Sequence, residues 1–134
     1  MTLPAAVAAI QVKAAAVSGI KQAPTNPFEQ SSMIPFAVCY ARTGTQTPQS
    51  SGWSVALHTL VCEIHCQRTV LSLAFAEALP LYESFASGVL ADPTLGGAVQ
   101  TINQLRYTFG GMEYDGTPTL GYRIEIDVKI TPTH

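Results

Sequence analysis

The stretch that decides the fold lies near the end of the chain and reads Leu120-Gly121-Tyr122-Arg123-Ile124-Glu125-Ile126-Asp127-Val128-Lys129-Ile130-Thr131. Apolar and charged side chains alternate through it, and this period of two predicts a strand with one core face and one polar face. Ile124, Ile126 and Val128 are expected to face the core. The polar face is expected to be a solvated or cross-subunit row of salt bridges, formed by Arg123, Glu125, Asp127 and Lys129.

Three further strands are predicted, over residues 34–42, 53–67 and 105–109, and two helices over residues 4–20 and 69–90. The order helix, two strands, helix, two strands predicts an α+β fold, a four-stranded mostly antiparallel sheet with both helices on its apolar face. The whole chain, residues 1–134, is expected to form one domain, because its length suits a single core.

In the second helix we expect Thr69 to be the N-cap and Pro80 to kink or split the helix. Its sheet-facing stripe is expected to be Leu71, Phe75, Ala78, Leu79, Tyr82 and Phe85. Residues 43–52 are predicted to be a flexible polar loop, because they contain almost nothing apolar. Residues 110–116 are predicted to be a turn-rich connection with a hairpin signal at Asp115-Gly116.

The composition is unusually poor in charge. Charged residues make up 12% of the 134 residues, against about 25% in typical domains. Obligate assembly surfaces are depleted in charge, so the composition favours assembly, although a plain monomer could be equally poor in charge. The chain has no apolar run long enough for a membrane span and no basic run that would predict sequence-specific nucleic-acid binding. Three cysteines, an odd number, favour a reducing cytoplasm over a secreted disulfide framework.

The segment Cys62-Glu63-Ile64-His65-Cys66 contains zinc-ligand residue types, but a strand cannot bring them to one metal. Positions four apart on a strand are about 13 Å apart, whereas zinc–sulfur bonds are about 2.3 Å. We expect two buried structural cysteines and an exposed His65 on the opposite face. His58 shares the face of Cys62, but it lacks a third group to orient it as a catalytic base, and a core or interface histidine is the favoured interpretation.

Other short motifs also lack the residues that their chemistry needs. Gly96-Gly97 and Gly110-Gly111 lack the lysine of a phosphate loop, so they are predicted to be places of positive φ or close backbone approach. Glu125 and Asp127 could form an acid–base pair. Their charged neighbours on the same strand favour the salt-bridge interpretation. The residues therefore predict no catalytic, cofactor or metal site, and no enzyme.

Four segments follow one another in a recognisable order: PFAV at residues 35–38, GW at 52–53 followed by LHTLVCEIH at 57–65, LADPTLGGAVQTI at 90–102, and LGYRIEI at 120–126. Together they resemble the tail terminator and tail completion proteins of long-tailed phages, of the lambda-like minor tail protein U type. The resemblance covers most of the chain beyond about residue 20. Cys39, Cys62 and Cys66 match no motif of that family, so it implies no role for them.

The resemblance implies a virion structural protein without catalytic residues or cofactors. Such proteins form hexameric rings that cap the tail tube, end its polymerisation and present their other face to head-completion proteins, while genome DNA only passes through the lumen. The implied location is the head-proximal end of the tail, after assembly in the bacterial cytoplasm. The sheet and its flanking loops would make the ring and tube contacts, with interface residues Arg123, Glu125, Asp127, Lys129, Thr43, Gly44, Gln46, Glu113 and Asp115.

Two alternatives remain open at this point. The first is a head-completion or connector ring, which is a related structural class. The second is a small-ligand-binding or enzymatic domain on a ferredoxin-like sheet, which would need a pocket with convergent polar groups.

Overall fold

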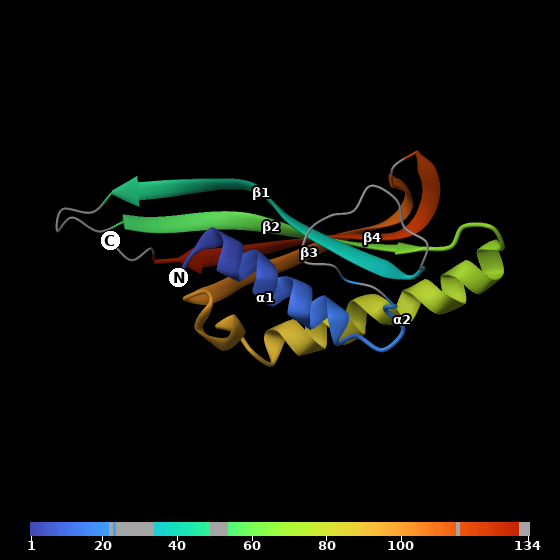
Figure 1. The fold of residues 1–134 in the computed structure, drawn as a ribbon, viewed down its shortest axis with the longest axis horizontal. Coiled ribbons are helices and arrows are strands. Elements are labelled where there is room, and N and C mark those ends of the chain that lie inside the picture. Colours follow the sequence, from blue (N-terminus) through green and yellow to red (C-terminus); the bar gives the residue numbers. More distant parts are fainter. Residues whose placement is uncertain (22, 24–33, 49–53, 115, 132–134) are drawn as a thin grey trace.

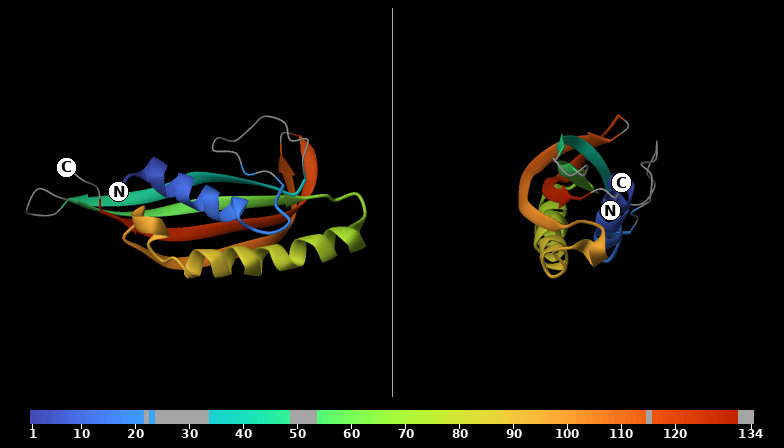
Figure 2. Two further views of the ribbon diagram at one scale, coloured as in Figure 1. Left: turned by 60° about the horizontal axis from the view of Figure 1, so that its bottom comes forward. Right: turned by 90° about the vertical axis from the view of Figure 1, so that its left-hand side faces the viewer.

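The computed structural model describes residues 1–21, 23, 34–48, 54–114 and 116–131. Four strands form one sheet in the order β1-β2-β4-β3, and all neighbouring strands are antiparallel. Both helices lie on the same face of this sheet (Figures 1 and 2), so the predicted α+β fold is confirmed. The elements are α1 (Leu3–Ala15), β1 (Phe36–Pro48), β2 (Ser54–Cys66), α2 (Leu71–Leu90), the short 3-10 helix η1 (Leu95–Gly97), β3 (Thr101–Tyr114) and β4 (Thr117–Ile130).

The core lies between the helices and the sheet. The predicted core face of β4 is confirmed, because Ile124, Ile126 and Val128 are all buried in one cluster with residues of both helices. The opposite face of the sheet, here called the open face, carries the charged residues of β4. None of the helices in the described part of the chain is long and apolar enough to cross a membrane.

Helix α1 is shorter than predicted, since it ends at Ala15 rather than near residue 20. It begins where the side chain of Thr2 accepts a hydrogen bond from the Ala5 amide, and Pro4 lies in its first turn, as predicted. Small buried residues, Ala6 and Ala14, let α1 pack closely on the sheet. Its packing is mainly over β1.

The start of helix α2 corrects the prediction for Thr69. The N-cap is Val70, whose side chain makes no capping bond. Instead, the side-chain carbonyl of Gln67 accepts hydrogen bonds from the amides of Thr69 and Val70, at 2.9 and 3.1 Å. Gln67 thus provides acceptors for free amides before the helix. Pro80 lies inside α2, which is one continuous element and is not split.

The sheet-facing stripe of α2 was predicted wrongly for three residues. The buried residues are Ala74, Ala78, Leu81, Phe85 and Val89. Leu71, Phe75 and Leu79 are instead 55%, 42% and 56% exposed. Helix α2 has two adjacent apolar stripes. The first consists of the buried residues, and its alanines, Ala74 and Ala78, let the helix approach the sheet closely. The second contains the exposed residues Phe75 and Leu79. The second stripe faces outward beside β3, where the sheet ends.

The predicted loop over residues 43–52 is wrong for its first part, because β1 continues to Pro48. Here β1 pairs with β2 as far as Pro48 and Ser54, in a two-stranded arm whose β1 side chains are exposed. Backbone pairing needs no apolar side chains, and threonine favours strands. A bulge at Arg42 precedes the arm. The rest of the predicted loop lies outside the described residues.

The hairpin of β3 and β4 corrects the prediction for residues 110–116. Gly110 and Gly111 lie within β3, which begins at Thr101 and ends only at Tyr114. The turn follows at once and includes Gly116, whose φ is +79°. This long hairpin curls back over the open face (Figure 2). The curl brings the Tyr114 ring to 5.0 Å from Phe36 and 5.2 Å from His65, measured between ring centroids.

Candidate functional site

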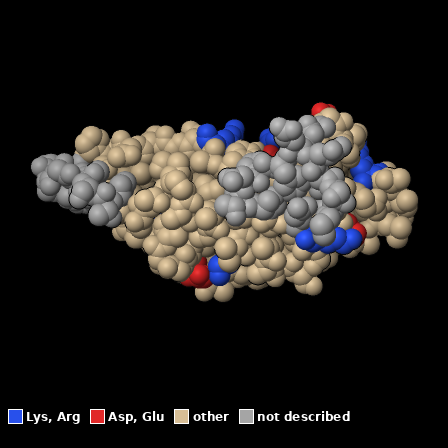
Figure 3. All heavy atoms as spheres, viewed as in Figure 1, with Lys and Arg blue, Asp and Glu red and all other residues tan. Residues whose placement is uncertain are grey.

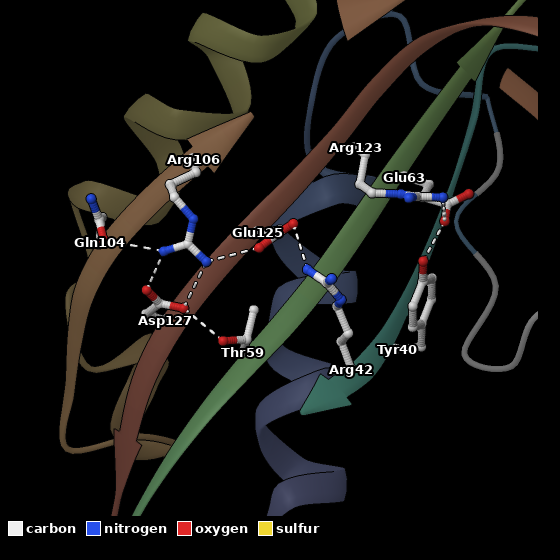
Figure 4. Close-up of polar contacts among 9 residues, drawn as sticks. All are labelled: Tyr40, Arg42, Thr59, Glu63, Gln104, Arg106, Arg123, Glu125 and Asp127. Atoms are coloured by element: carbon white, nitrogen blue, oxygen red, sulfur yellow. Dashed lines mark hydrogen bonds and ion pairs between the residues drawn. The ribbon is translucent and has the colours of Figure 1, made fainter. Parts of the chain in front are cut away.

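A ladder of ion pairs crosses the open face and joins three of the four strands directly (Figure 4). Arg106 of β3 reaches β4, where its Nη2 lies 2.8 Å from Glu125 Oε2 and its Nη1 bonds Asp127. Arg42 of β1 reaches the same carboxylate of Glu125, also at 2.8 Å. From β2, Thr59 donates a hydrogen bond of 2.8 Å to Asp127. The prediction that Glu125 and Asp127 form salt bridges on this face is confirmed, but their partners, Arg106 and Arg42, lie on other strands of the same chain.

Two sequence features make the ladder possible. β4 alternates from Tyr122 to Ile130, so Glu125 and Asp127 point to the same side of the sheet. Both edge strands have a register irregularity beside this row, at Arg42 in β1 and at Asn103 in β3. Such bulges redirect side chains at sheet edges. The hydrogen bonds from Arg106 lower the pKa of both carboxyls, and the pKa of Arg106 is raised in turn.

We predict that Arg106→Ala lowers the melting temperature by a few degrees at pH 7, because two neighbouring carboxylates lose their shared cation. Groups with a lowered pKa stabilise the fold above their unfolded pKa, about 4, and this contribution is lost as the pH falls through the folded pKa. The difference from wild type should therefore shrink toward about pH 3. Thermal unfolding across this range measures it, with Arg106→Lys as the control that keeps the charge. A difference that does not depend on pH would contradict the prediction.

A second polar cluster is buried at the curled end of the open face. His65 is fully buried and not exposed, which corrects the prediction. Its Nε2 lies 2.9 Å from Glu63 Oε1, and its Nδ1 lies 2.7 Å from the Thr119 hydroxyl. The ring also stacks on Phe36, with centroids 4.9 Å apart. The curled hairpin supplies Thr119 and the covering Tyr114, so local alternation could not reveal this burial.

Glu63 accepts bonds from several directions. Tyr40 donates a hydrogen bond to it, and Arg123 Nη2 lies 3.5 Å from the same carboxylate oxygen (Figure 4). Burial opposes ionisation of Glu63, but the hydrogen bonds from His65 and Tyr40 outweigh it and lower its pKa. Burial and the bond to Glu63 raise the pKa of Tyr40 to about 12. The cluster is internally satisfied and presents Arg123 as its outermost charge, with a side chain 53% exposed.

The cysteines are free, buried thiols. Cys62 and Cys66 lie in the core on the helix side, whereas His65 lies on the open face, so the predicted separation of these residues is confirmed. A hydrogen bond with Cys39 and burial raise the pKa of Cys62, and burial raises that of Cys66 to about 12. Raised pKa values disfavour the thiolate that nucleophilic or metal chemistry requires.

The glycine pairs have different roles. Gly96 and Gly97 have φ values of +67° and +91°, so the predicted positive φ is confirmed. There the Gly96 amide donates to Asp92, whose carboxylate also lies 3.3 Å from Lys13 Nζ, which ties the loop to α1. In β3 neither Gly110 nor Gly111 has a positive φ, and a Cβ on Gly111 would meet only the end of the Arg68 side chain, 2.9 Å away at Nη1, so the prediction is wrong for this pair.

The predicted interface residues do not form one patch. Arg123, Glu125 and Asp127 belong to the two clusters above, and Lys129 continues their row along β4. Thr43 lies in the row of Thr59 and Asp127. Gly44 and Gln46 lie in the arm, Glu113 lies at the opposite end of the sheet, and Asp115 is outside the described residues. The sequence interpretation missed four partners within the clusters: Arg42, Thr59, Glu63 and Arg106.

A shallow depression of about 480 Å³ lies on the sheet beside the ladder. All four strands contribute to it, for example through Thr43, Leu57, Gln104 and Asp127. Thr59 already donates a hydrogen bond to Asp127, which also accepts one from Arg106, so these polar groups are poorly placed to converge on a small ligand. In comparisons with known proteins, no family model matches the chain, and no curated protein matches it either.

Proposed function

We propose that the chain is a virion structural protein that caps the tail tube of a long-tailed phage. It ends tube polymerisation and provides the surface on which the head is joined. It works as a ring of identical copies, six by the resemblance in sequence, and its other partners are the tail tube protein and a head-completion protein. Genome DNA passes through the lumen of the ring. The ring forms in the host cytoplasm and stays at the head-proximal end of the tail.

The observation that carries this proposal is the apolar surface of α2. Leu71, Phe75 and Leu79 are between 42% and 56% exposed, and their spacing of four residues places them on one side of the helix. Contiguous exposed apolar residues mark protein–protein contact surfaces. Charged atoms are also few over the part of the molecule drawn in Figure 3. Together with the low charge content, these features favour a chain that works in an assembly over an enzyme or a ligand-binding domain.

Removing the protein from its phage should produce tails that are longer than wild type, variable in length and not joined to heads. The reason is that nothing would stop the tube from growing. Electron microscopy of lysates measures the distribution of tail lengths, and expression of the chain from a plasmid should restore it. Tails of normal length beside unjoined heads would contradict capping and would favour the connector ring.

A further inference from the structure

The two edges of the sheet are β1 and β3, and these strands run in opposite directions. Within the described residues, β1 pairs with β2 alone and β3 with β4 alone. An edge strand can accept another strand through its outward N–H and C=O groups. Because the two edges are antiparallel to each other, a second copy in the same orientation would place its β1 antiparallel to β3 of the first.

The edge at β3 is bordered by the outer flank of α2, the apolar stripe that consists of Phe75, Leu79, Tyr82, Ala86 and Leu90. Phe75 contacts Phe109 of β3, and Tyr82 contacts Tyr107, with ring centroids 5.7 and 4.2 Å apart. Leu79 and Leu90 are nevertheless 56% and 59% exposed, and Tyr107 is 53% exposed. This apolar surface therefore continues from the helix to the edge strand.

The edge at β1 is bordered by α1, whose exposed residues are small. Ala8 and Ala15 are exposed, and so is Val12. Small side chains let two helix axes come close together. Residues 1–21 contain two lysines, Lys13 and Lys21, and no acidic residue.

The charges of the two helices disfavour a symmetric contact between two α2 helices. Helix α2 contains two acidic residues, Glu77 and Glu83, and no basic residue. Contact between two α2 helices brings like charges together. Helix α1 has no acidic residue, and its Lys13 is paired with Asp92 of its own chain, so contact between α2 of one copy and α1 of the next avoids this repulsion. The charges thus favour a head-to-tail contact over a symmetric one.

The widths of the two layers also match. Strands lie about 4.8 Å apart, so four strands span about 19 Å. Packed helices lie about 8–10 Å apart, so two helices span about 16–20 Å. When a second copy continues the sheet, its α1 therefore lies on the β3 side of α2 of the first copy, because two helices and four strands have similar widths.

We propose that copies of this chain join head to tail, with the β3 edge and outer flank of α2 of one copy against the β1 edge and α1 of the next. The sheet continues from copy to copy, and the second apolar stripe of α2 becomes buried. This inference rests on the proposed function and names the contact that builds the ring.

Two variants test the contact, each blocked at one edge. Leu79→Glu with Leu90→Glu blocks the α2 edge, and Ala8→Glu with Ala15→Glu blocks the α1 edge. All four positions are exposed and glutamate suits helices, so both variants should fold, which circular dichroism and thermal melting verify. In sedimentation at millimolar concentration, wild type should form oligomers and each variant alone should stay monomeric. An equal mixture should form dimers and nothing larger, because only one pair of intact edges remains.

The matched control is Leu73→Glu. Leu73 is 63% exposed on the same helix but points about 120° away from Leu79, so this variant should assemble like wild type. In the variant Ala8→Glu with Ala15→Glu, only the α2 edge is intact. If this variant dimerises without the other, the α2 edge pairs with itself. That result would overturn the inference. So would a wild-type protein that stays monomeric, or variants that both still form the wild-type oligomers. The two proposals can fail separately. If the mixture forms heterodimers but a phage lacking the protein still makes normal tails, the contact is supported and the proposed function is overturned.

Discussion

Ile126→Asp should leave the chain unable to fold. Ile126 is fully buried in the central strand β4, between the sheet and both helices. An aspartate there would place a carboxylate among apolar side chains without a partner, and it would also remove a large buried side chain. We expect a loss above about 4 kcal/mol, comparable to the whole stability of a small domain. Circular dichroism and urea unfolding of the purified variant measure it.

The control for this prediction is Ile126→Val, which removes one methylene and should cost about 1 kcal/mol. A folded Ile126→Asp protein with near-native stability would mean that β4 can expose this face, and it would contradict the position of the core.

Gly121→Ala should cause the second large loss of stability. Gly121 of β4 lies opposite His65 of β2. A Cβ on Gly121 would overlap the carbonyl oxygen of Ile64 and lie 2.9 Å from its carbonyl carbon. Backbone atoms of a central strand cannot move aside as a side chain can, so β2 and β4 would have to separate. We expect a loss of about 3 kcal/mol or more in the free energy of unfolding, measured in urea.

Gly110 provides a matched control, because it pairs directly with Gly121 across the hairpin. A Cβ on Gly110 would meet nothing within 4 Å. Gly110→Ala should therefore change the stability by no more than about 0.5 kcal/mol. Equal losses in the two variants would show that the close approach at Gly121 is not the cause.

Side-chain alternation predicted those strands in which one face is buried against the helices and the other is exposed to solvent. From Tyr122 to Ile130, β4 alternates and separates a core from an aqueous face, so the residue pattern alone was enough to assign the two faces of this part. The arm of β1 could not be predicted in this way, because Thr43 and its neighbours pair through the backbone and bury almost nothing. In α2, Phe75 and Ala78 both suit a buried stripe, and only the position of the sheet edge decides which of them is covered.

The candidate site was predictable for one strand only. The sequence indicated that Glu125 and Asp127 share a face with Arg123. Arg106 was detectable in principle, because it alternates with Leu105 and Tyr107 in a predicted strand. Its pairing with β4 depends on strand order and register. His65 was misjudged for a similar reason, since the residues that cover it arrive from a hairpin more than forty positions later.

The two hairpins point to opposite ends of the sheet. The turn between β1 and β2 follows Pro48 at one end, and the turn between β3 and β4 follows Tyr114 at the other (Figure 1). In the proposed ring, where every copy has the same orientation, one rim would consist entirely of straight arms and the other entirely of curled hairpins. Such a ring would be polar, because its two rims would present different surfaces. A stack of tube subunits that ended on one rim would thereby stop growing, and the unlike rim would remain for a different partner.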